Sequence, residues 1–175
     1  MALFTLLLVL IGFGALVFQR DTETRQLRAY ISIETAGPVE NFTETTLAQA
    51  KVRIRNSGQT PAYHLISQGT IDFGPYPLSE NQTFQLNLPR EPPSVVVLNP
   101  GAEDGGTIIP AEKPYTATQL ASVKDGKSVR LYVFGTVTYR DAFRSEHYSY
   151  YCFSYFGIPP QLTHMEVCSK RNDAN

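Results

Sequence analysis

Apolar and polar residues follow two different patterns along this chain. Positions 2–19 form an apolar run without a charged residue, whereas several later segments alternate between apolar and polar side chains. At about 1.5 Å of rise per residue the run predicts a helix of about 27 Å, close to the hydrocarbon thickness of a bilayer. It lacks the basic start of a secretory signal, and its small residues lie inside the run instead of after it. We therefore expect a retained transmembrane anchor over residues 1–19 and a short charged stalk over residues 20–27.

A period of two in the apolar positions predicts β-strands in the rest of the chain. The clearest segment is "AKVRIRN", in which Ala50, Val52 and Ile54 face inward. The longest is "SVRLYVFGTVTY", whose inward residues are Val129, Leu131, Val133, Val137 and Tyr139. Further strands are expected over residues 27–34, 62–73, 83–88, 94–98 and 147–156.

Turn and helix signals separate these segments. Gly58 in "NSGQTPA" is free to take a positive φ, and the strand over residues 62–73 is expected to be bent or bulged at Gly69. The segment "YTATQLASVKDGK" predicts one short helix, with Thr116 or Thr118 as the N-cap, Leu120 and Val123 on the buried side and Gly126 at the end.

About seven strands with turns every 8–12 residues predict an all-β fold. We expect an immunoglobulin-like antiparallel β-sandwich over residues 28–168, preceded by the single N-terminal transmembrane helix and followed by a polar tail over residues 169–175. The last two strands should form a central hairpin. A barrel is the lesser alternative.

Two stretches carry a resemblance to known proteins. The run "VRIRNSGQTPAYHL" is similar to the strand, Asn-x-Gly turn and strand of many bacterial immunoglobulin-like modules. The pairing of "TRQLRAYISIE" with "GTVTYRDAFRSEHYSYYCF" resembles a group of uncharacterised bacterial membrane-anchored proteins. In that group a Gly is expected after "DAF", where this chain has Arg144. The resemblance implies a fold and no activity.

Charge and cysteine content bear on partners and compartment. A net charge of −1 without a long basic run gives no indication of nucleic-acid binding. Basic residues follow the anchor (Arg20, Arg25 and Arg28) and none precedes it, which favours the cell inner membrane with the domain in the cytoplasm. The periplasmic side stays open as the alternative. Cys152 and Cys168 are predicted to be buried thiols in the cytoplasm or one disulfide outside it.

Two arrangements of reactive residues are too poorly spaced to indicate chemistry. His147, Cys152, His164 and Cys168 have the residue types of a zinc site, but positions five apart on a strand point to opposite faces, so we expect no metal and histidines at the solvent edge. Ser57, His64 and Asp141 lack the pattern of a nucleophile with its base, and Asp141 is predicted to be a turn residue. We therefore expect no enzyme activity and no cofactor.

Aromatic density is the feature that points to binding. The strand "YSYYCFSYF" is aromatic on both faces, although a sandwich strand needs only one apolar face. Placing Tyr151, Phe153 and Tyr155 inward leaves four aromatic residues for a partner interface, namely Tyr132, Phe134, Tyr148 and Tyr150. In the anchor, the small residues Gly12, Gly14 and Ala15 would let another helix approach closely.

These expectations combine into one interpretation. The chain is predicted to be a non-enzymatic, single-pass membrane subunit that binds and stabilises a larger assembly of integral membrane proteins in the lipid bilayer. An energy-transducing complex, photosynthetic or respiratory, is the candidate host. The alternative is a tethered ligand-binding or enzymatic envelope domain, but the short stalk favours a subunit held close to the membrane.

Overall fold

The described part of the chain contains two helices and eight strands. The computed structural model describes residues 2–35, 37–78, 93–170 and 172–175. In chain order the elements are α1 (Ala2–Leu27), β1 (Ile31–Thr35), β2 (Gln49–Asn56), β3 (Ala62–Pro75), β4 (Val96–Leu98), β5 (Thr107–Pro110), α2 (Ala117–Ser122), β6 (Val129–Arg140), β7 (Glu146–Phe156) and β8 (His164–Val167).

The strands form two antiparallel sheets, one in the order β1-β2-β5 and one in the order β4-β3-β6-β7-β8. The predicted all-β character and the predicted β6–β7 hairpin near the centre of the larger sheet are therefore confirmed. The four-residue strands β5 and β8 were not predicted. The strand predicted over residues 83–88 lies outside the described residues.

The larger of two core clusters contains residues from both sheets. On β2, Ala50, Val52 and Ile54 are buried and the residues between them are exposed, as the alternation predicted. The inward residues predicted on β6 face the same cluster. The short helix α2 is also confirmed, with Thr116 as its N-cap and Val123 fully buried.

The bulge, one of the two alternatives predicted at Gly69, lies elsewhere in β3. The register of β3 against β6 shifts between Tyr63 and Ile66, and His64 there has a φ of 49°. Gly69 pairs with Gly135 across the ladder, and a Cβ at either position would lie within 2.4 Å of the Tyr151 hydroxyl. Both glycines are needed because the Tyr151 side chain crosses the core directly over them.

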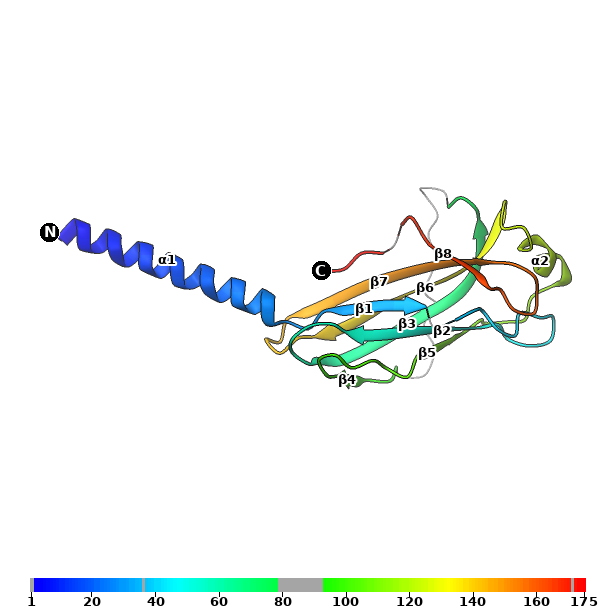
Figure 1. The fold of residues 1–175 in the computed structure, drawn as a ribbon, viewed down its shortest axis with the longest axis horizontal. Helices are drawn as coiled ribbons and strands as arrows, with labels where there is room; N and C mark the ends of the chain where they lie inside the picture. Colours follow the sequence, from blue (N-terminus) through cyan, green and yellow to red (C-terminus); the bar gives the residue numbers. More distant parts are fainter. Residues whose placement is uncertain (1, 36, 79–92, 171) are drawn as a thin grey trace.

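The helix α1 joins the sheets without a linker. It runs through the predicted stalk to Leu27, and Ala29 is already fully buried. The Tyr139 hydroxyl donates to the Ala29 carbonyl at 3.2 Å, and the Ser57 amide donates to the Tyr30 carbonyl at 2.8 Å. In Figure 1, α1 projects from one end of the sheets, next to the β6–β7 loop, while α2 lies at the far end.

The last residue of β2, Asn56, and Gly58 in the turn after it hold this junction. Asn56 is fully buried; its Oδ1 accepts hydrogen bonds from the amides of Tyr30 and Gly58, and its Nδ2 donates to the carbonyls of Thr60 and Leu98. Gly58 does not use the freedom to take a positive φ. It is required for a different reason, because a Cβ there would lie 2.4 Å from the Arg28 carbonyl oxygen.

The small residues predicted to pack against another helix lie on the exposed surface of α1. Gly12, Gly14 and Ala15 are exposed, and a Cβ at either glycine would meet nothing within 4 Å. Among the described residues, no helix combines the length and the apolar character needed to cross a membrane.

The polar tail follows the edge of β7. The amide of Tyr150 donates to the Asp173 carbonyl at 2.7 Å, and Asn175 pairs with the backbone of Tyr148. The tail thus extends the pairing that β8 makes with the second half of β7.

The packing at this junction predicts that alanine substitutions at two glycines will change stability by different amounts. Gly58→Ala should lower the free energy of unfolding by about 2 kcal/mol, because backbone atoms of residues 28–30 must move to admit the methyl group. Gly105 has no atom within 4 Å of its would-be Cβ, so Gly105→Ala should be neutral or slightly stabilising. Urea unfolding of the full chain in detergent measures both, and equal effects would contradict the packing explanation.

Candidate interaction surface

The β6–β7 hairpin has an inner and an outer face. Tyr151, Phe153 and Tyr155 belong to the core cluster, so the inward assignment of these three residues is confirmed. The four residues predicted as the partner interface lie on the outer face, but two of them are buried and two are accessible.

Half of that outer face is covered, which corrects the predicted interface. Tyr132 and Phe134 are each only 1% exposed and form a second apolar cluster with Cys152, Cys168 and Leu78. The cover comes from the segment after β3 and the end of β8, which are distant in sequence. Tyr132 and Phe134 therefore cannot serve as exposed contact residues.

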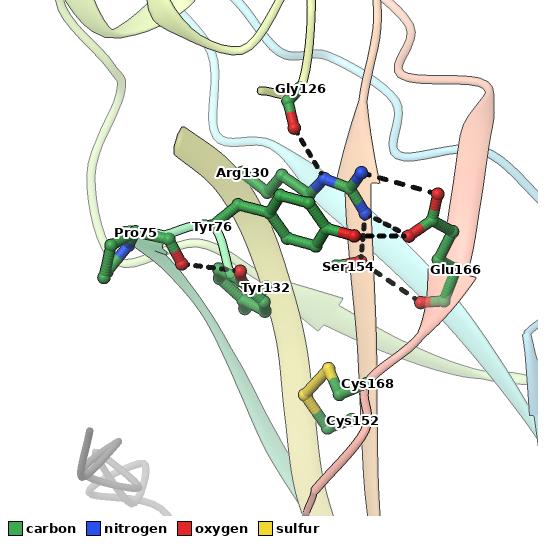
Figure 2. Close-up of polar contacts among 9 residues, drawn as sticks. All are labelled: Pro75, Tyr76, Gly126, Arg130, Tyr132, Cys152, Ser154, Glu166 and Cys168. Atoms are coloured by element: carbon green, nitrogen blue, oxygen red, sulfur yellow. Dashed lines mark hydrogen bonds and ion pairs between the residues drawn. A yellow bond between two sulfur atoms is a disulfide. The ribbon is translucent and has the colours of Figure 1, made fainter. Parts of the chain in front are cut away.

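An arginine locks this cover in place (Figure 2). Arg130 is 5% exposed, and its guanidinium carbon lies 3.3 Å from the centre of the Tyr76 ring and 4.5 Å from that of Phe156. Its Nε donates to the Gly126 carbonyl at 2.9 Å and its Nη1 to Ser154 Oγ at 3.2 Å. One cation thus joins the exit of β3, the loop before β6 and strand β7.

The same guanidinium pairs with the β8 carboxylate of Glu166. Nη1 donates to Oε2 and Nη2 donates to Oε1, the latter at 3.4 Å. The hydrogen bond from Arg130 holds the pKa of Glu166 below its usual range. The stabilisation from this pair is therefore present above the ordinary carboxyl pKa and is lost as the pH falls through the lowered one.

Next to this pair, the buried Tyr132 hydroxyl donates to the Pro75 carbonyl at 2.8 Å, and burial raises the pKa of Tyr132 to about 12. The tyrosine is therefore neutral at physiological pH and acts as a hydrogen-bond donor that fastens the end of β3 to the outer face of β6.

A disulfide adds a covalent link between β7 and the end of β8. Cys152 on β7 is bonded to Cys168, just after β8, across a separation of 16 residues. Of the two predicted states, the structure has the bridge. Because the two sulfurs are bonded to each other, neither is a thiolate that could take part in a zinc site with His147 and His164.

Asp141 and His147 form a buried pair at the opposite end of the hairpin. Asp141 Oδ1 accepts from the amides of Phe143 and Ser145, both at 2.9 Å, which confirms the predicted turn role. Its Oδ2 lies 2.8 Å from His147 Nε2. The prediction of a solvent-edge histidine holds for His164, which is exposed, and is wrong for His147, whose side chain is 8% exposed.

The other half of the outer face is open. Tyr150 is 46% exposed, and its ring centre lies 5.0 Å from that of Tyr148. Beside them is a hollow of about 450 Å³, lined on the outer face by His64, Ile66, Thr138, Arg140, Glu146 and Tyr148. We call the tyrosine pair and this hollow the proximal surface, because Arg140, Glu146 and Tyr148 adjoin the β6–β7 loop, which lies at the α1 end of the sheets (Figure 1).

Comparison with known proteins gives no further assignment. No family model, no curated protein and no solved structure matches the chain.

Strand β6 carries two arginines that each pair with a glutamate, and comparing their replacements gives a matched test of stability. Arg130→Ala should lower the free energy of unfolding by about 2–3 kcal/mol, because buried hydrogen bonds and two ring contacts are lost. Arg140 pairs with Glu146 at 2.6 Å, but both side chains are more than half exposed, so Arg140→Ala should cost less than about 0.5 kcal/mol. Losses of equal size in urea unfolding would contradict the locking role of Arg130.

Proposed function

We propose that this protein is a non-enzymatic, single-pass membrane subunit that binds and stabilises a larger membrane assembly. Its domain is an immunoglobulin-like β-sandwich of the kind found in bacterial membrane-anchored proteins. Residues 2–19 carry no charge and lie in the continuous helix α1, which supports their role as the anchor.

The observation that carries the proposal is the absence of a linker between α1 and the sheets. A receptor or enzyme domain on a tether needs a flexible segment to reach its ligand. Here the helix ends at Leu27, and Ala29 and Tyr30 are held by hydrogen bonds to Tyr139 and Ser57. The domain therefore keeps one orientation relative to the anchor, as a subunit packed against neighbours in the membrane requires.

The proximal surface is the proposed site of contact with an integral membrane protein. It lies at the α1 end of the sheets, where a partner in the same bilayer can reach it. Paired tyrosines provide large contact area with few rotatable bonds, and such residues are enriched at the centres of interfaces. Gly12, Gly14 and Ala15 are the proposed contact with a partner helix inside the membrane.

The disulfide and the arginine count favour opposite compartments. Arg20, Arg25 and Arg28 favour a cytoplasmic domain. A bond between Cys152 and Cys168 favours an oxidising compartment, since thiols in the cytoplasm are kept reduced. The arginine difference is only three residues, so we give the disulfide more weight and propose the periplasmic side of the inner membrane.

The interface is tested by paired substitutions in the full chain. Burying two tyrosines is worth about 3–6 kcal/mol, so Tyr148→Ser with Tyr150→Ser should weaken assembly by at least about a hundredfold. The measurement is co-purification of partner proteins from native membranes in mild detergent, quantified by mass spectrometry. Ile158→Ser is the matched control, because Ile158 is 75% exposed in the β7–β8 loop at the far end of the sheets (Figure 1).

Folding is monitored in the same preparations. The midpoint of urea unfolding should stay unchanged in both variants, since all three side chains have exposed surface. Full retention of partners by the double variant would exclude the proximal surface as the interface. A wild-type chain that purifies alone would exclude the subunit function.

The compartment is tested with thiol and protease probes. Cells are quenched with acid to preserve the thiol–disulfide state, and the protein is then denatured near neutral pH for labelling. A polyethylene-glycol maleimide should modify Cys152 and Cys168 only after reduction. External protease should digest the domain in right-side-out vesicles and leave it intact in inverted ones. Direct modification without reductant, together with digestion in inverted vesicles, would place the domain in the cytoplasm.

A further inference from the structure

The end of the sheets that carries α1 exposes aromatic and cationic side chains together. Phe143, at the tip of the β6–β7 loop, is 44% exposed, and Arg144 beside it is exposed. Tyr30 is exposed directly after α1, and Arg25 is exposed in the last turn of the helix. In Figure 1 the β6–β7 loop lies next to the end of α1.

The contacts of Tyr30 show how far along α1 these exposed side chains lie. Its hydroxyl donates to the Arg25 carbonyl at 2.7 Å, and its ring lies 4.5 Å from the Arg28 guanidinium. Arg25 follows Gln19, the end of the uncharged run, by about 9 Å of helix rise. The polar layer on each side of a bilayer is roughly 5–8 Å thick, so with Gln19 at the edge of the hydrocarbon the Tyr30 hydroxyl would lie at the outer boundary of this layer.

The β6–β7 loop is held in one shape. Asp141 binds two amides of the loop, and its own amide donates to the Ser145 carbonyl at 3.1 Å. Arg144 has a φ of 69°, in the left-handed region that favours glycine. The chain thus carries a cationic side chain at a position that glycine would occupy with less strain. Among the described contacts, none pairs the Arg144 side chain with a carboxylate.

Aromatic rings beside arginines are the side chains that proteins place at the polar surface of a membrane. Tyrosine rings favour the headgroup level, and arginines near the surface are attracted to anionic lipids. The rigid junction at Ala29 and Tyr30 keeps this end of the domain turned toward the bilayer. We propose that Phe143 and Arg144 contact the headgroups of anionic lipids, so that the domain stands on the membrane surface beside its own anchor.

This inference rests on the proposed anchor, and the experiment separates the two. The chain contains no tryptophan, so one substitution creates a single fluorescent reporter. Phe143→Trp reports on the loop, and Ile158→Trp, in the β7–β8 loop at the far end, is the matched control. Each full-length variant is incorporated into vesicles of phosphatidylcholine and phosphatidylglycerol that contain a lipid with a nitroxide on its headgroup.

The expected result is loss of most of the Phe143→Trp emission and little change for Ile158→Trp. Adding Arg144→Gln to the reporter removes one positive charge and should reduce the ratio of quenched to unquenched reporter about fivefold, the effect of about one arginine near a charged surface. Leaving out the anionic lipid should reduce this ratio at least as much. A failure of the protein to float with the vesicles would overturn the anchor and this proposal together. Flotation without quenching would overturn the lipid contact alone, and protection of the reporter only in the native complex would assign the loop to a protein partner.

Discussion

The arrangement of helix and sheets depends on the buried side chain of Asn56. Its amide satisfies four backbone groups in segments that are far apart in the sequence, from Tyr30 after the helix to Leu98 on β4. A carboxylate could only accept hydrogen bonds, and an apolar side chain could do neither, so any such replacement leaves buried backbone groups unpaired. Because the helix exit, the β2–β3 turn and β4 meet at this one residue, the orientation of the domain on its anchor follows from it.

The outer face of the larger sheet is divided between structure and contact. At the far end, Arg130, Glu166 and the disulfide fasten β8 and the segment after β3 over Tyr132 and Phe134. At the α1 end nothing comparable covers the described part of the face, and Tyr148 and Tyr150 remain accessible. On this face the disulfide and the buried Arg130–Glu166 pair thus lie away from the helix, whereas the accessible tyrosines and the exposed Arg140–Glu146 pair lie near it.

The alternation of residues predicted which face each side chain takes, but it could not predict what covers that face. On the inner face the prediction and the structure agree, since Leu131 and Tyr151 lie in the core as expected. Phe134 was placed on the correct face and yet is buried, because its cover comes from Leu78 and Cys168. Such contacts between distant segments leave no periodic signal. The strands β5 and β8 were missed since four residues are too few to establish a period of two.

The tail has a practical consequence for anyone who handles this protein. Asn175 pairs with the backbone of Tyr148, so any residues joined after Asn175 emerge beside the tyrosine pair. An affinity tag or fluorescent fusion joined directly after Asn175 would therefore crowd the proximal surface and compete with whatever binds there. An internal tag in the β7–β8 loop, near the exposed Ile158, would keep purification handles away from both that surface and the helix.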